Sequence, residues 1–337
     1  MRLIDTRDVE ATRYSEINTW SACRQKWYYQ YYLNLERVFA NPTMTRGAMG
    51  HIGLEALDKG EDPAVAVAEF VDDYISKIPM VEIDGVTSIE HCETILQASV
   101  DVIDQIKEYA AYYPAWDSVV ALETRFAFYI VSSKCNDIPI YGTWDGIVEH
   151  QGALWLLERK WVKQFRTPEM FDLDGQFAIY KMGAQAEGFD IAGVIVDQIG
   201  PKPKRPSLNL PKKNKETGLE ERSMSRTAVG DWRTYEKALL EAGLDPADYQ
   251  DMKEKLPDCS QFRRDFVVKT DKEVENYSEH VKLKLEELAS EEKRIYLADD
   301  RFKCQSCNFR ELCIESIKGN DIDEIIESQF VVKQRSY

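Results

Sequence analysis

Three ionisable residues interrupt two strongly apolar segments of the chain. Asp145 lies between Trp144 and Ile147, and the pattern Glu158-x-Lys160 directly follows a run of leucines and a tryptophan. Unpartnered charges are costly in apolar surroundings, so these groups need a common neutralising partner. A divalent cation would be such a partner, and carboxylate oxygens favour Mg²⁺ or Mn²⁺. A neighbouring lysine suits an anionic transition state, which indicates metal-assisted attack of water on a phosphodiester.

The spacing of these residues predicts that they share one face of a β-hairpin. Gln151-Gly152 is a plausible two-residue turn. Such a turn pairs His150 with Ala153 and places Asp145 directly opposite Glu158. Lys160 follows Glu158 by two residues and therefore points to the same face. The alternative is an ordinary exposed strand face, where Asp, Glu and Lys are common, but the apolar neighbours favour a functional site.

A second cluster of candidate ligands lies near the end of the sequence. Cys304-x2-Cys307-x5-Cys313 places three thiols within ten residues, a spacing typical of a metal site. A tetrahedral zinc site or a four-iron cluster needs a fourth ligand. The residues alone do not choose among the four other cysteines, which are Cys23, Cys92, Cys135 and Cys259.

The elements that must position these groups follow from hydrophobic periodicity and from turn residues. An aromatic helix is predicted over 15–38, with Ser15 as its N-cap, and further helices over 45–59, from Pro63, and over 88–113. Residues rich in Val, Ile, Phe and Trp predict strands over 118–131, 138–149, 153–162, 191–199 and 263–269. Helices are expected over 170–187, 229–256 and 272–293. This order predicts an α/β or α+β core in which helices flank one mixed central sheet.

Composition and charge exclude several classes of protein. The chain has 337 residues, 44% hydrophobic and 30% charged, and a net charge of −16, which argues against a fibrous or disordered protein and against a uniformly basic nucleic-acid coat. The apolar runs are too short to cross a bilayer, and the first ten residues do not resemble a secretory signal. We therefore expect a cytoplasmic protein without membrane contact, whose cysteines are thiols or metal ligands.

One segment departs from the acidic average. Residues 201–226 contain eight basic and three acidic side chains together with four prolines, which predicts a loop. The loop could contact backbone phosphates through Lys202, Lys204 and Arg205. A solvated linker is the alternative interpretation.

Taken together, these patterns resemble the PD-(D/E)XK nuclease superfamily in its RecB-like branch. The matching motifs are Gly142-x-x-Asp145, Glu158-x-Lys160, Gly47-x3-His51 and Gln176-x3-Tyr180, in the order of that family. Trp144 precedes the aspartate where the family motif has proline, and Glu158 stands where aspartate is more common. The resemblance implies a restriction-endonuclease-like fold. It also implies a metal ion held by His51, Asp145, Glu158 and the backbone carbonyl of Arg159, with Lys160 beside the attacking water and Gln176 and Tyr180 on the substrate strand.

The resemblance also implies which cysteine is the fourth ligand. The CRISPR-associated exonucleases and the AddB-type nucleases carry one cysteine near the N-terminus and three near the C-terminus, which ligate a [4Fe–4S] cluster. Ser15-x7-Cys23 resembles the N-terminal element, although Arg24 stands where proline is usual. This implies a cluster held by Cys23, Cys304, Cys307 and Cys313 that ties the two ends of the nuclease together. Zinc is the alternative, and the remaining cysteines are interpreted as ordinary thiols.

These patterns predict a Mg²⁺- or Mn²⁺-dependent DNA exonuclease acting on single-stranded DNA or DNA ends. Recombination, repair, and phage or CRISPR DNA processing are the expected settings, in a bacterial or phage-infected cell. The alternative is a non-catalytic DNA-end-binding adaptor, and a homo-oligomer or a recombination-protein partner stays open. We expect a single nuclease domain over 1–337, with a helical part (15–115), a catalytic core (116–200), a basic loop and helical insertion (201–260), and a C-terminal part with a strand, a helix and the cysteines (261–337).

Overall fold

The computed structural model describes residues 2–4, 12–132, 139–203, 206–208, 210–213, 220–222, 230–290, 293–298 and 300–333. The chain forms two compact units. The first contains residues 1–158, 167–195 and 266–337, and the second contains residues 159–166 and 196–265. No helix in the described part of the chain is both long and apolar enough to span a membrane.

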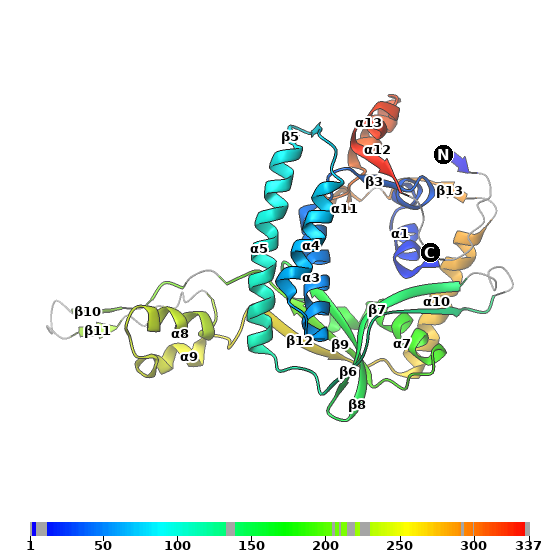
Figure 1. The fold of residues 1–337 in the computed structure, drawn as a ribbon. Helices are drawn as coiled ribbons and strands as arrows, with labels where there is room; N and C mark the ends of the chain where they lie inside the picture. Colours follow the sequence, from blue (N-terminus) through cyan, green and yellow to red (C-terminus); the bar gives the residue numbers. More distant parts are fainter. Residues whose placement is uncertain are drawn as a thin grey trace. The chain divides into compact units, whose positions relative to one another are not determined.

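Three packed helices form one side of the first unit. They are α3 (Pro42–Lys59), α4 (Pro63–Ser76) and α5 (Ser88–Tyr112), and Figure 1 shows them side by side in blue to cyan. Asn41 and Asp62 cap α3 and α4, each followed by proline at the first helical position. The packing is close, because a Cβ atom on Gly53 would lie 2.3 Å from Ile106 Cδ1. The helix that carries His51 is therefore held tightly against its neighbours.

The central sheet is mixed. Its long strands are β6 (Ser118–Tyr129), β7 (Pro139–His150), β8 (Ala153–Trp161), β9 (Gly193–Ile199) and β12 (Phe262–Val267). The order is β12-β9-β8-β7-β2, with β6 also paired to β7. The short strand β2 (Thr12–Arg13) runs parallel to β7, whereas β6 and β8 run antiparallel to it. The predicted mixed sheet flanked by helices is confirmed.

Three further helices of the first unit come from distant parts of the chain. They are α6 (Pro168–Asp172), α7 (Gln176–Ala186) and α10 (Asp271–Ala289), and α7 packs on β6, β7 and α10. A Cβ atom on Gly183 would lie 2.4 Å from the ring of Phe126, so glycine permits this close approach of α7 to the sheet. Phe126 in turn stacks on Trp144, with 4.6 Å between ring centroids. The apolar face of β7 is thus buried beneath α7.

The N-terminal segment and the C-terminal segment lie together in the first unit. The N-terminal elements are β1 (Arg2–Ile4), α1 (Tyr14–Ala22), α2 (Arg24–Trp27), a π-helical turn (Tyr28–Tyr32) and β3 (Leu35–Arg37). The C-terminal elements are β13 (Lys293–Ile295), α11 (Arg301–Gln305), α12 (Arg310–Lys318), α13 (Asp323–Gln329) and β14 (Phe330–Val332). Strand β14 pairs with β3, and β13 pairs with β1. A two-stranded ribbon of β4 (Glu82–Ile83) and β5 (Val86–Thr87) precedes α5.

The second unit has an apolar core of its own. Its helices are α8 (Trp232–Glu241), a 3-10 turn (Pro246–Tyr249) and α9 (Gln250–Lys255), which enclose Trp232, Tyr235, Leu239, Tyr249 and Met252. The buried Asp197 receives two hydrogen bonds from the guanidinium of Arg264, at 2.6 and 2.8 Å. The ribbon of β10 (Pro211–Lys213) and β11 (Glu220–Arg222) also belongs to this unit.

The structure confirms most of the predicted elements and corrects several. The helix predicted over 170–187 is divided into α6 and α7, and the helix predicted over 229–256 is divided into α8, a 3-10 turn and α9. The aromatic helix predicted over 15–38 is broken at Cys23, whose extended backbone separates α1 from α2. Ser15 lies inside α1 and is not its N-cap, because the helix already begins at Tyr14. The stretch predicted as a loop over 201–226 contains the short strands β10 and β11.

Candidate active site

The β7–β8 hairpin has the register predicted from its turn. Gln151 and Gly152 both adopt positive φ values, 52° and 76°, as a type I′ turn requires. The pairing runs from His150–Ala153 to Gly146–Leu157. Asp145 and Glu158 are the next residues along the two strands, so the hairpin brings both carboxylates to one end of this ladder.

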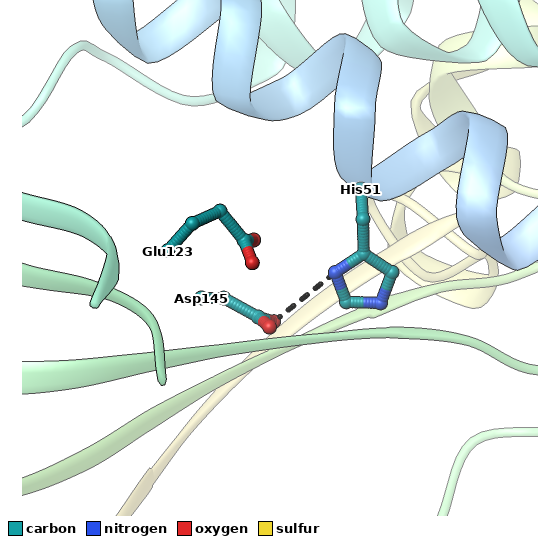
Figure 2. A group of neighbouring side chains, drawn as sticks. All are labelled: His51, Glu123 and Asp145. Carbon is teal, nitrogen blue, oxygen red and sulfur yellow. Dashed lines mark ion pairs between the residues drawn. The ribbon is translucent and has the colours of Figure 1, made fainter. Parts of the chain in front are cut away.

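Helix α3 adds His51 to Asp145. The imidazole Nδ1 lies 3.4 Å from the Asp145 carboxylate, and both side chains are more than half buried, at 35% and 14% exposure. Figure 2 shows the ring reaching from α3 toward the strand that carries Asp145. Burial lowers the pKa of His51, but the hydrogen bond to Asp145 and the charges of Asp145, Glu158 and Glu123 outweigh it, and the net pKa is raised. The electrostatic potential at the site is therefore strongly negative.

Glu123 is a further member of this group that the sequence reasoning missed. Its neighbours in β6 pair with the neighbours of Asp145, since Leu122 lies opposite Gly146 and Thr124 opposite Trp144. Glu123 itself has a φ of 44°, a left-handed value that is costly for a residue with a side chain. Its carboxylate points toward His51 and Asp145 (Figure 2). The only sequence signal was an acidic residue inside a strand rich in apolar residues.

One ligand atom from each of His51, Glu123 and Asp145 lies within 4.8 Å of the other two. Ligand atoms about 2.1 Å from an octahedral ion lie at most about 4.2 Å apart, so a small closing movement would let all three bind one cation. Carboxylate oxygens suit Mg²⁺ and Mn²⁺, and an imidazole nitrogen is also common at transition-metal sites. The donor set therefore fits a divalent cation.

Glu158 is held by two residues of α7. Its side chain is 5% exposed. The Gln176 amide donates to Glu158 Oε1 at 3.1 Å and to the Tyr180 hydroxyl at 2.8 Å, and that hydroxyl lies 2.8 Å from Glu158 Oε2. Burial, followed by the charges of Glu158 and Asp145, raises the pKa of Tyr180 well above its usual value, so the phenol stays neutral and donates. The predicted shared face of Gln176 and Tyr180 is confirmed, and it faces Glu158.

The remaining predicted residues of the nuclease site lie outside the first unit or outside the described residues. Arg159, which is 2% exposed, and the half-buried Lys160 continue β8 beyond Glu158 into the second unit. Alternation along the strand places Lys160 on the same face of β8 as Glu158. Lys202 is exposed in the second unit, whereas Lys204 and Arg205 lie outside the described residues.

The four cysteines singled out for a cluster line one cavity of about 750 Å³, which they share with apolar side chains. Cys23 lies at the break between α1 and α2, where its sulfur accepts a hydrogen bond from the Lys26 backbone at 3.4 Å. Burial and the other cysteines raise the pKa of Cys313 to about 12. Among the described residues, no three cysteine sulfurs all lie within 4.8 Å of one another. Cys92 does not line this cavity, Cys259 belongs to the second unit, and Cys135 lies outside the described residues.

Comparison with known proteins identifies a family and several similar solved structures. No curated protein matches the chain. A crystal structure from Eubacterium rectale, provisionally described as an exonuclease, aligns with a TM-score of 0.41 and 11% identity, over 90% of this chain and 88% of the other. The family model described as the PD-(D/E)XK nuclease superfamily matches residues 14–314. The match includes both carboxylate strands, the helix with His51 and the helix with Tyr180, and the chain belongs to the PD-(D/E)XK nuclease superfamily.

Proposed function

We propose that this nuclease is a Mg²⁺- or Mn²⁺-dependent exonuclease that hydrolyses single-stranded DNA or DNA ends. The observation that carries the proposal is the convergence of His51, Glu123 and Asp145 on one space, with ligand atoms within 4.8 Å of one another. Three different elements supply these groups, and a like-charged pair of carboxylates is unfavourable without a cation. Membership of a nuclease superfamily makes a phosphodiester the substrate bond.

We assign each residue of the site a separate task. His51, Glu123 and Asp145 would hold the ion, together with Glu158 and the backbone carbonyl of Arg159. The ion would supply Lewis acidity at the scissile phosphate and would lower the pKa of the attacking water. Lys160 would orient that water by a hydrogen bond and offset the negative charge that develops on the phosphate oxygens.

Gln176 and Tyr180 would fix the position of Glu158. Their two hydrogen bonds, at 3.1 and 2.8 Å, hold both oxygens of this buried carboxylate. Residues that hydrogen-bond a ligating carboxylate commonly orient it and tune the metal. Gln176 is only half-buried, so we propose that its amide also faces the substrate strand near the scissile phosphate.

We further propose that Cys23, Cys304, Cys307 and Cys313 hold a [4Fe–4S] cluster. The four residues line one cavity, and a single zinc ion with Zn–S bonds of about 2.3 Å would need sulfurs about 3.8 Å apart. A larger group with four thiolate ligands also suits a cavity that four cysteines line. Such a group would close a chain segment of about 280 residues, and the entropy of closure grows with the logarithm of that length.

The nuclease assignment is tested with oligonucleotides labelled at the 5′ or the 3′ end, incubated with Mg²⁺ or Mn²⁺. We expect stepwise release of short products from an end of the wild-type substrate and no cleavage of a circular single strand. Lys160→Ala should lower the rate by about 100-fold or more, whereas Lys163→Ala, which alters an exposed lysine just beyond β8, should not. Cleavage by Lys160→Ala at the wild-type rate would show that Lys160 has no role in the mechanism. Wild-type protein that binds ends without cutting them would instead be an adaptor.

The cluster assignment is tested by iron and sulfide analysis of anaerobically purified protein. A brown preparation with about four irons per chain is expected. Cys313→Ser should lose iron, whereas Cys92→Ser should keep it, because Cys92 does not line the cavity. A colourless protein that contains one zinc per chain would refute the iron–sulfur proposal.

A further inference from the structure

The ring of Tyr277 in α10 packs directly against Gly175, the residue that precedes helix α7. A Cβ atom on Gly175 would overlap this ring, so Tyr277 fills the space that any larger residue would need. The Gly175 carbonyl accepts a hydrogen bond of α7 from the Ile179 amide at 3.1 Å, and Gln176 is the first residue of that helix. Tyr277 therefore touches the backbone from which the Gln176 side chain extends.

The far end of the Tyr277 ring is held by the N-terminal helix α1. Its hydroxyl lies 3.1 Å from the hydroxyl of Tyr14, and one of the two groups donates to the other. Burial, followed by the hydrogen bond with Tyr277, raises the pKa of Tyr14, so this phenol stays neutral. Helix α10 packs on both α1 and α7 (Figure 1). Segments from the beginning, the middle and the end of the chain thus meet at this ring.

A second set of contacts holds α7 and α6 to the start of α10. The Lys181 ammonium on α7 donates to the Lys269 carbonyl at 2.7 Å and to the Asp271 carboxylate at 2.9 Å. The buried Lys269 ammonium in turn donates to the Asp172 carbonyl of α6 at 2.8 Å. These contacts oppose sliding of α7 along α10, so the ring of Tyr277 stays opposite Gly175.

Gln176 connects this packing to the buried carboxylate of the candidate site. Its side-chain amide donates to Glu158 Oε1 at 3.1 Å, and its backbone amide donates to Asp174 Oδ1, also at 3.1 Å. Hydrogen bonds weaken steeply when they are misaligned. A shift of the first residue of α7 would therefore loosen one of the two contacts that orient Glu158.

We propose that Tyr277 is a positioning residue of the nuclease site. Its ring, held by Tyr14, fixes the start of α7 and thereby sets the hydrogen bond through which Gln176 orients Glu158 toward the metal ion. The proposal rests on the proposed function, in which Glu158 is a ligand, and it extends the set of supporting residues to one that does not contact the carboxylate. Residues behind a ligating carboxylate commonly tune metal affinity.

The test is isothermal titration with Mn²⁺ in the absence of DNA. Tyr277→Leu removes the ring, and Tyr277→Phe retains it. The matched control is Tyr129→Leu, which alters a 60%-exposed tyrosine on β6. Gly175→Ala disturbs the same contact from the other side and replaces Tyr277→Leu if that variant does not fold. Circular dichroism verifies the fold of each variant.

Tyr277→Leu should weaken Mn²⁺ binding about tenfold, the lower end of the range found for residues that support a metal ligand. Tyr277→Phe should bind Mn²⁺ as the wild type does, because the ring against Gly175 is retained. In the cleavage assay, Tyr277→Leu should lower kcat at limiting Mn²⁺ and leave KM for the oligonucleotide unchanged, since the ion acts in hydrolysis.

A double variant tests whether Tyr277 acts through Gln176. In the Gln176→Leu background, the hydrogen bond to Glu158 is already lost, so adding Tyr277→Leu should change Mn²⁺ affinity by no more than about twofold. A packing role unrelated to the metal would leave Mn²⁺ affinity unchanged in every folded variant.

Unchanged Mn²⁺ affinity in folded Tyr277→Leu or folded Gly175→Ala would overturn the proposal. Additive losses in the double variant would overturn it too, as would an equal loss in Tyr277→Phe. Failure of the nuclease assignment has a different signature, because it would appear as wild-type protein that does not cleave DNA, and the Mn²⁺ titration involves no DNA.

Discussion

Replacing Tyr180 by phenylalanine removes one hydroxyl from the buried side of the candidate site. That hydroxyl is 2.8 Å from Glu158 Oε2, in surroundings where the two side chains are 8% and 5% exposed. A hydrogen bond to a charged group contributes about 1.5–3 kcal/mol net. Water cannot readily replace the lost donor at this depth, so we expect Tyr180→Phe to lower the free energy of unfolding by that amount.

The same substitution should affect the metal. If Glu158 is a ligand, loss of a group that orients it should weaken Mn²⁺ binding or activity by about 10- to 100-fold. Gln176→Leu removes the other donor to the same carboxylate. Because both donors serve one group and also contact each other, the double variant should cost less than the two single variants combined.

Two measurements separate the structural effect from the functional one. Urea unfolding gives the change in stability, and isothermal titration with Mn²⁺ gives the change in affinity. Tyr129→Phe and Gln185→Leu are the matched controls, because both residues are exposed, and Gln185 lies on the same helix as Gln176. Neither control should change stability by more than about 0.5 kcal/mol. Wild-type stability and wild-type Mn²⁺ affinity in Tyr180→Phe would refute the interpretation of this hydrogen bond.

Three further predictions follow from single contacts. Glu123→Gln should weaken Mn²⁺ binding about tenfold in the same titration, whereas Glu149→Gln, which alters an exposed residue near the end of β7, should not. Burial raises the pKa of Glu16 from 4.5 to about 7, against the hydrogen bonds from Trp27 and Thr12 that lower it. The folded state therefore binds more protons than the unfolded state between these values, and the free energy of unfolding should fall by about 3 kcal/mol as the pH rises through this window. Urea unfolding at pH 5 and pH 8 should show a smaller fall in Glu16→Gln, and identical pH profiles would contradict the assignment. Gly175→Ala should destabilise the protein by about 1–3 kcal/mol, because the added Cβ would lie 1.7 Å from the ring of Tyr277. Gly47→Ala in α3, with no atom within 4 Å of the added Cβ, should instead stabilise it by about 0.5–1 kcal/mol in thermal or urea unfolding.

Local chemistry determined much of the hairpin that carries two of the carboxylates. A two-residue turn with glycine in second place admits one register, and strand alternation then orders every side chain beyond it, so Asp145 and Glu158 could be paired before any coordinates were known. The same holds for Gln176 and Tyr180, because residues four apart on a helix share a face. Pro63 likewise located the start of α4.

Contacts between distant segments decided the rest. Glu123 joins the site because β6 pairs with β7 in a register that sets its neighbours opposite the neighbours of Asp145. Its φ of 44° is a strained value, and a strained backbone is stable only when the surrounding structure enforces it. The convergence of Cys23 with Cys304, Cys307 and Cys313 depends on the packing of two ends of the chain, which spacing alone does not encode. The sequence by itself therefore determined the residue types and the local register of the site. Only the tertiary structure decided which groups lie close together. Periodicity describes the side chains within one element, whereas contacts between elements depend on how those elements pack.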